Sequence, residues 1–326
     1  MGKATPSVSV VIRSFNEEEH IGRLLSGILQ QSLRPKDIIL VDSGSTDATV
    51  SIAERYPVTV VHLPPDEFTF GRSLNEGCAH ARGDAIAIAS AHVYPVYPDW
   101  LSELVSPLGD PGIALTYGRQ RGDGPTRFSE HRIFAKWFPA SSNGRQTSPF
   151  CNNANAAVRR DLWARHPYDE DLPGLEDVAW ATWALAAGYA LAYVAEAEVI
   201  HVHKETPGQV FNRYRREAMA LRRLRQLERF HLGDLVRLYL SNSWSDFAAA
   251  RRAGVLGASA WEILWFRWMQ FWGTYRGFSL SGPLTSELKH TFYYPAEAGH
   301  PSGPRARGVA AIDYRSAGHE SQRRPR

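Results

Sequence analysis

Val8-Ser9-Val10-Val11-Ile12 is a nearly continuous apolar run rich in β-branched residues, and it decides the fold. Such a run is typical of a strand buried on both faces of a parallel sheet. Further strand patterns follow at 38–41, 58–61, 85–89, 113–117 and 191–199. Helical patterns separate the early strands, and strands that alternate with helices form βαβ units. We therefore predict an α/β fold with a mostly parallel sheet covered by helices on both faces.

The residues after the first strand predict a helix. Asn16 is expected to cap it, with the acidic residues 17–19 in its first turn. The apolar positions of this helix recur at helical spacing: Ile21, Leu24, Leu25, Ile28 and Leu29. In open α/β sheets, ligands bind beyond the carboxyl ends of the strands, so polar residues after each strand are the candidate site.

The 326 residues are enough for one large domain with an appendage. We predict a catalytic domain over 1–208, an arginine-rich helical region over 209–302, and a disordered tail over 303–326 that has little apolar content. The polar stretch 118–148 indicates a long loop of the functional or disordered kind. A formal net charge of only +3 argues against a nucleic-acid partner.

The sequence also bears on the compartment. Residues 1–7 do not fit a secretory signal, and no run of about 18 uncharged apolar residues predicts a membrane span. We expect a cytoplasmic protein, which the basic stretch 213–229 could bring to the inner face of a membrane. The tryptophan-rich stretch 261–272 has three open interpretations: an interfacial helix on anionic lipid, a homo-oligomer interface, or a helix packed on the first domain.

Several ordered motifs carry a resemblance to a known family. They are Val10-Val11-Ile12-Arg13-Ser14-Phe15-Asn16-Glu17, Val41-Asp42-Ser43-Gly44-Ser45-Thr46-Asp47, and Phe70-Gly71-Arg72-Ser73-Leu74-Asn75-Glu76-Gly77. In this order they resemble family 2 glycosyltransferases, and the similarity runs from about residue 8 to residue 203. The resemblance implies a GT-A fold and an inverting transferase that uses a nucleotide-sugar donor.

The resemblance places the nucleotide pocket in these motifs. It implies that the base, ribose and diphosphate are held by Ser14, Asn16, Asp42, Ser43 and Arg72. The chemistry of Asp42 agrees, because a carboxylate at a strand end can accept hydrogen bonds from a base or ribose beside a phosphate-binding helix start. The alternative is that Asp42 and Asp47 only cap a turn.

The chain departs from the family where an Asp-x-Asp motif usually binds a divalent cation. Ser90-Ala91-His92 stands there instead, and the resemblance points to His92, His201 and His203 as ligands. The two later histidines face the same side if their strand continues. We expect Mn²⁺ or Mg²⁺, although imidazole in place of carboxylate weakens affinity for hard ions such as Mg²⁺. His92 could instead bond the diphosphate or only pack, and His201 and His203 could be surface residues.

Gly174-Leu175-Glu176-Asp177 resembles the Glu-Asp motif of the family, whose carboxylate deprotonates the acceptor hydroxyl. Asp177 is the predicted base, and Glu176 is the second choice or an acceptor-orienting partner. A positioned base typically contributes about 10²- to 10⁴-fold to the rate. The alternative is that both carboxylates only favour the start of a helix.

Two further groups are candidates for sugar and phosphate contacts. Asn152, Asn153 and Asn155 offer amides that suit the hydroxyls of the donor sugar or acceptor, or else form a network of turns. Arg213 and Arg216 could hold the diphosphate, because guanidinium groups match phosphate oxygens. Their alternative is a solvated helical face.

These expectations describe a transferase that moves a sugar from a nucleotide-diphosphate donor to a glycan or lipid-linked acceptor in envelope glycan synthesis. One rival is a catalytically inactive sugar-nucleotide-binding protein with the same fold. A sugar-phosphate nucleotidyltransferase is the other rival. It needs a glycine-rich loop after the first strand, where this chain has Arg13-Ser14-Phe15-Asn16.

Overall fold

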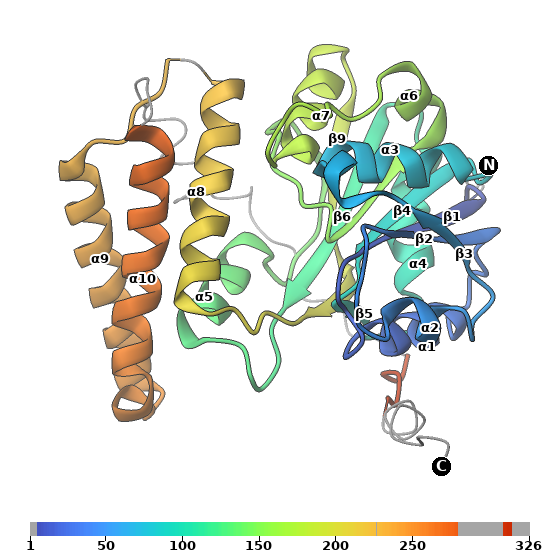
Figure 1. Ribbon diagram of the computed structural model, residues 1–326. Coiled ribbons are helices and arrows are strands. Elements are labelled where there is room, and N and C mark those ends of the chain that lie inside the picture. The colour runs from blue at the N-terminus through green and yellow to red at the C-terminus, as the bar shows by residue number, and fades with distance from the viewer. Residues whose placement is uncertain (1–4, 226, 280–308, 315–326) are drawn as a thin grey trace.

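The computed structural model describes residues 5–225, 227–279 and 309–314, and its centre is a mixed sheet with the strand order β3-β2-β1-β4-β8-β6-β9-β5 (Figure 1). β7 pairs with β9 off this path. The strands are β1 (Val8–Ser14), β2 (Asp37–Asp42), β3 (Thr59–His62), β4 (Ala85–Ser90), β5 (Val93–Pro95), β6 (Ile113–Arg121), β7 (Asn143–Gln146), β8 (Asn155–Arg159) and β9 (Ala190–His201).

The α/β class is confirmed, but only part of the sheet is parallel. β1 to β4 pair in parallel, as do β6 and β9. β8 runs antiparallel between β4 and β6, and both β5 and β7 run antiparallel to β9. These later strands are joined by irregular segments instead of regular βαβ crossovers, so the alternation of the first half could not predict their direction.

Helices bury apolar residues on both faces of the sheet. On one face Val10 and Ile12 pack with α1, α2 and α4, and on the other Val11 packs with α3, α6 and α7. This division follows from the alternation of side chains along a strand. The helices before the carboxyl-terminal region are α1 (Ile21–Leu29), α2 (Thr49–Ala53), η1 (Pro65–Glu67), α3 (Phe70–His80), α4 (Trp100–Val105), η2 (Ser106–Gly109), α5 (Phe128–Trp137), α6 (Arg160–Arg165) and α7 (Glu176–Ala186).

Three long helices follow the sheet: α8 (Pro207–Leu224), α9 (Leu232–Arg252) and α10 (Leu256–Ser279). The side chain of Thr206 and that of Gln209 form a capping box, which explains why α8 begins at Pro207, close to the predicted domain boundary. α10 packs closely on α8. At Gly277 the two helices come so near that a Cβ atom there would lie only 2.5 Å from the carbonyl oxygen of Arg215. Figure 1 shows these helices beside the sheet domain, with α5 between the two parts.

Three local predictions are wrong. Asn16 does not cap α1, because its φ angle is 54° and its side-chain oxygen accepts the N–H of Thr46 in the next loop. The stretch 118–148 is not one long loop, since it contains the end of β6, all of α5 and β7. The predicted tail also includes residues that contact the sheet domain: Ile312 N–H donates to the carbonyl of Val96 at 2.9 Å.

The remainder of that predicted tail, 303–308 and 315–326, lies outside the described residues, as does 280–302 of the predicted helical region. Among the helices of the described ranges, none combines the length and the apolar character needed to cross a bilayer.

Candidate active site

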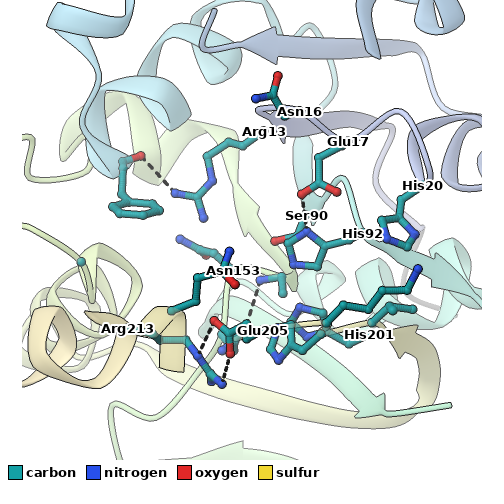
Figure 2. Close-up of a pocket in the computed structure, with 18 of the residues that line it drawn as sticks. Arg13, Asn16, Glu17, His20, Ser90, His92, Asn153, His201, Glu205 and Arg213 are labelled. Carbon is teal, nitrogen blue, oxygen red and sulfur yellow. Dashed lines mark hydrogen bonds and ion pairs between the residues drawn. The ribbon is translucent and has the colours of Figure 1, made fainter. Parts of the chain in front are cut away.

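A cavity of about 670 Å³ opens where β1, β4 and β9 end and where α7 and α8 begin. Residues distant in sequence meet there, as Figure 2 shows for Arg13, His92 and Asn153. The predicted site residues that line it are Asn16, His92, Asn152, Asn153, Glu176, Asp177, His201, His203, Arg213 and Arg216. Those that do not line it are Ser14, Asp42, Ser43, Arg72 and Asn155. We call this space the donor cavity.

The two carboxylates stand at the start of α7. Leu175 precedes them with a left-handed backbone (φ 59°), which turns the chain so that Glu176 and Asp177 occupy the first helical turn at the cavity wall. Asp177 accepts the backbone N–H of Asn153 at 3.1 Å and that of Val178 at 2.8 Å. Burial, together with the neighbouring charge of Glu176, raises the pKa of Asp177 to about 7.

Glu176 has a different environment. Its Oε1 lies 3.0 Å from a guanidinium nitrogen of Arg13 and 3.4 Å from the amide nitrogen of Asn153. An ion pair with arginine holds a carboxylate in a fixed position. The two adjacent carboxylates therefore differ in kind: Glu176 is engaged in an ion pair, whereas Asp177 can exchange a proton near neutral pH.

Arg13 and Arg216 converge on one aromatic ring. Their guanidinium carbons lie 5.1 and 4.5 Å from the ring centroid of Phe70, at the start of α3. The Nε of Arg216 is buried without a hydrogen-bond partner. Sequence reasoning missed Arg13 as a site residue. The available signal was a charged residue at the end of an otherwise apolar strand.

Three imidazoles gather on one side of the donor cavity. His92 lies in the turn between β4 and β5, His201 ends β9, and His203 follows two residues later. One ring nitrogen from each lies within 4.8 Å of the others. The rings of His92 and His201 stack with centroids 5.0 Å apart, which places them side by side (Figure 2). The predicted convergence of these histidines is therefore present.

Each imidazole is oriented by an oxygen acceptor. The Nδ1 atoms of His92, His201 and His203 lie 2.6, 2.7 and 2.6 Å from side-chain oxygens of Glu17, Gln120 and Glu130 respectively. Because these oxygens accept, Nδ1 carries the proton and Nε2 of a neutral ring keeps its lone pair.

His201 is the ring whose surroundings most favour ligation. Its Nε2 is buried without a partner. Burial, followed by the charges of His203, His92 and Arg213, lowers the pKa of His201 well below its ordinary value, so the ring is neutral. A neutral, oriented imidazole with a free nitrogen is the form that binds a metal ion. The residues present fit a divalent cation.

Two polar residues at strand ends, Asp42 and Ser14, contact the segment that follows β2. Asp42 Oδ2 accepts the N–H groups of Gly44 and Ser45, each at 3.1 Å, while Oδ1 is buried without a partner. The Oγ of the neighbouring Ser14 is also buried and unpaired. Ser43 is buried and donates its N–H to the carbonyl of Ser14 at 3.0 Å. These unpaired atoms are the notable feature of the predicted nucleotide pocket.

Three predicted site residues have other partners. The amide of Asn155 is wholly buried and bonds the indole of Trp100 and the carbonyls of Arg119 and Ala197, so it braces the sheet. Arg213 pairs with Glu130 at 2.9 Å and with Glu205 at 2.5 Å, which occupies its guanidinium. Arg72 pairs with Glu67 on the surface. Within the described residues, Arg13 and Arg216 are better placed than these two arginines to meet a diphosphate.

Comparisons with known proteins give one consistent set. The family model described as glycosyl transferase family 2 matches residues 9–165. The O-antigen chain rhamnosyltransferase WbaN of Salmonella anatum is 29% identical over 221 residues, covering 64% of this chain and 70% of the relative. Glycosyltransferase AglE of Haloferax volcanii is 26% identical over 218 residues, again covering 64% and 70%.

Solved structures show the same kind of fold. The mannosyltransferase PcManGT from Pyrobaculum calidifontis, in complex with GDP-Man and Mn²⁺, has a TM-score of 0.57 at 21% identity, covering 85% of this chain and 87% of that chain. Glucosyl-3-phosphoglycerate synthase from Mycobacterium tuberculosis, with Mn²⁺, UDP and glucosyl-3-phosphoglycerate, has a TM-score of 0.52 at 22% identity, covering 68% and 81%. At these identities the likeness concerns the fold alone.

Proposed function

Because the chain belongs to glycosyltransferase family 2 and has a GT-A-like fold, we propose that it transfers a sugar from a nucleotide-diphosphate sugar to an acceptor hydroxyl with inversion. The observation that carries this proposal is Asp177, a buried carboxylate with a pKa raised to about 7 at the wall of the donor cavity. The hydroxyl would attack the anomeric carbon opposite the departing nucleoside diphosphate, while Asp177 accepts the hydroxyl proton.

Asp177 is suited to this role because a general base works best when its pKa lies near the working pH. It is then ionised in enough molecules and still basic enough to take a proton. Glu176 would be held in position by Arg13 and orient the acceptor or the sugar. The amide of Asn153, whose Oδ1 is buried without a partner, is available to a sugar hydroxyl.

Arg13 and Arg216 would neutralise the leaving diphosphate. Fixed positive charge at the point where negative charge develops lowers the barrier without reorganisation. Both side chains line the donor cavity and pack on Phe70, which limits their movement. We assign the nucleoside to Asn16, Ser14, Asp42 and Ser43, since the unpaired Asp42 Oδ1 and Ser14 Oγ could bond a base or ribose.

His92, His201 and His203 would hold a divalent cation, which would supply further charge stabilisation for the diphosphate when bound. Three imidazoles discriminate against Mg²⁺, which prefers oxygen ligands, so Mn²⁺ is the better of the two expected ions. The Mn²⁺ complexes of the structurally similar mannosyltransferase and synthase support a cation in this fold.

The acceptor setting follows from the relatives. WbaN is named an O-antigen chain rhamnosyltransferase and AglE a glycosyltransferase, so we propose a hexosyl or deoxyhexosyl transfer in assembly of a polysaccharide, glycolipid or envelope glycan. α9 supports a membrane-surface location, because Leu232, Val236, Leu240 and Trp244 are all exposed at a spacing of four residues. Exposed Arg237, Arg251 and Arg252 on the same helix would complement anionic lipid at the inner face of the membrane.

The experiment is a thermal-stability screen of nucleotide-diphosphate sugars, followed by turnover assays with the donor that binds. A donor at 100 times its Kd should stabilise the fold by about 2.7 kcal/mol. Binding followed by transfer to any acceptor would support the proposal. Tight donor binding with no turnover over a broad acceptor panel would favour the inactive sugar-nucleotide-binding protein.

A further inference from the structure

A second cavity, of about 430 Å³, lies among α5, α9 and α10. Three cationic side chains line it, Arg132, Lys136 and Arg267, together with one carboxylate, that of Asp246. The rest of its polar wall consists of Ser241, Asn242, Ser245 and Gln270. We call this space the cationic cavity.

The single carboxylate does not cancel this positive charge. Asp246 is only 1% exposed, and its oxygens accept the Nε of Arg132 at 2.7 Å and the Nε of Arg267 at 2.8 Å. Three cations against one carboxylate leave a net of two positive charges among the lining residues. Burial and the guanidiniums of Arg267 and Arg132 lower the pKa of Lys136, as expected where the local potential is positive.

A third cavity, of about 160 Å³, lies between the other two and shares wall residues with each. It shares Ile133, Trp137 and Gln270 with the cationic cavity. It also shares Asp177 and His201 with the donor cavity. The three spaces are therefore neighbours in series, and Asp177 borders both the first and the third.

Aromatic side chains dominate this connecting cavity: Phe134, Trp137, Phe138 and Phe150. Amides of Gln120 and Asn152 also line it. Aromatic faces pack on the C–H face of a sugar ring, and amides bond its hydroxyls, so the space suits one sugar beside Asp177. Guanidinium and ammonium groups in the next space suit phosphate.

We propose that the cationic cavity binds a phosphate or diphosphate group carried by the acceptor, while the acceptor sugar occupies the aromatic cavity beside Asp177. This inference rests on the proposed transfer reaction and adds the class of acceptor: a sugar whose far end is phosphorylated, either as a soluble sugar phosphate or as a lipid-linked diphosphate.

The test is isothermal titration of inorganic pyrophosphate, at fixed ionic strength, into the full chain and its variants. All proteins carry Arg216→Gln, which weakens any pyrophosphate binding in the donor cavity. Lys136→Gln should weaken affinity about tenfold, in the range of a lost hydrogen bond to a charged group. Lys36→Gln is the matched control, because Lys36 does not line this cavity and donates to the carbonyl of Arg82; the pyrophosphate affinity of this variant should not change.

Ser245→Asp is a second variant that leaves Lys136 and the two arginines in place. It adds a carboxylate at an exposed position whose hydroxyl accepts from Arg132 at 3.0 Å, and it should weaken pyrophosphate as well. Undetectable binding to the Lys36→Gln protein, or equal affinities for Lys136→Gln and Lys36→Gln, would overturn the proposal.

Two further measurements complete the test. One distinguishes a lipid-linked acceptor from a soluble sugar phosphate, and the other separates this proposal from the proposed transfer reaction. Geranyl diphosphate that binds more tightly than pyrophosphate supports the site and indicates a lipid-linked acceptor; equal affinity supports the site and indicates a soluble sugar phosphate. Failure of the transfer proposal would look different: no nucleotide sugar would stabilise the wild-type chain, while the effect of Lys136→Gln on pyrophosphate would persist.

Discussion

Arg13 and Glu176 form an ion pair of 3.0 Å between the end of β1 and the first turn of α7, although 163 residues separate them in the chain. The pair connects two walls of the donor cavity and holds the carboxylate of Glu176 in position. Its neighbour Asp177 has no such partner, so burial controls its proton affinity. The division of roles between two adjacent carboxylates thus depends on one arginine.

Replacing the proposed base should remove chemistry and spare donor binding. Asp177→Asn keeps one oxygen to accept the N–H of Asn153 or Val178, so the loop and helix start should hold. We expect kcat to fall about 10²-fold or more, since a general base contributes at least that much. Steady-state kinetics and donor titration measure the two effects. Glu176→Gln is the comparison variant. It should also weaken donor binding, because Arg13 would lose its ion-pair partner. A near-normal kcat in Asp177→Asn would refute the assignment.

Activity should depend on the ionisation of Asp177. Its pKa is raised to about 7, and only the carboxylate form accepts a proton, so kcat/KM should rise with pH and level off above about pH 7. A pH–rate profile measures this. A profile that is flat between pH 5 and pH 8 would show that a different group limits the reaction.

The same pKa predicts a stability effect of opposite sign. Because the folded pKa of Asp177 exceeds its unfolded value of 3.8, the folded state binds the proton more tightly. The wild-type chain should therefore lose stability relative to Asp177→Asn as pH rises from about 4 to about 7, with no further change above that. Melting temperatures of both proteins across this range test the prediction. A difference that is constant with pH would mean that the carboxyl is not buried as described.

The sequence predicted the groups that follow directly from strand ends. Asp42, His92 and Asp177 were expected at one cleft; His92 and Asp177 do line one cavity, together with His201, whereas Asp42 does not line it. The β-branched run at β1 and the repeated strand patterns were sufficient for the α/β class. Local sequence patterns and the order of the strands are therefore sufficient to predict where in the fold the site lies.

Partners that depend on long-range pairing could not be predicted. Arg213 and Asn155 were chosen for residue type, but Arg213 meets Glu130 from α5, a helix inside a stretch that reads as polar loop, and Asn155 meets Trp100 of α4. Arg13 was overlooked because its partner Glu176 lies in a distant motif. In each case the chemistry of a side chain was visible, while the contact that uses it was not.

The acceptors behind the three histidines should control metal affinity. Glu17→Ala removes the oxygen that holds His92 Nδ1 at 2.6 Å, and loss of such a partner typically weakens metal binding about 10- to 100-fold. Isothermal titration with Mn²⁺ on the chain alone measures this without any assay of transfer. Glu54→Ala is the control, because Glu54 is an exposed carboxylate at the end of α2 outside the donor cavity. Equal Mn²⁺ affinity in both variants, or unchanged turnover of wild type in EDTA, would oppose a histidine-held cation.

The exposed apolar stripe of α9 should bind lipid. Leu240 is 59% exposed and Trp244 is 76% exposed, a solvation cost that insertion into a lipid interface would remove. The double variant Leu240→Gln/Trp244→Gln should lower co-sedimentation with vesicles containing anionic lipid about tenfold or more, because each buried side chain contributes on the order of 1.5–3 kcal/mol. Since both residues are exposed, the melting temperature should stay the same, which separates lost docking from lost folding.

Arg251→Gln/Arg252→Gln should weaken binding to anionic vesicles and leave the weaker binding to zwitterionic vesicles unchanged, as screened charge attraction requires. If neither pair changes sedimentation, the stripe serves another contact and the membrane proposal fails, while the transfer reaction remains open to its own tests.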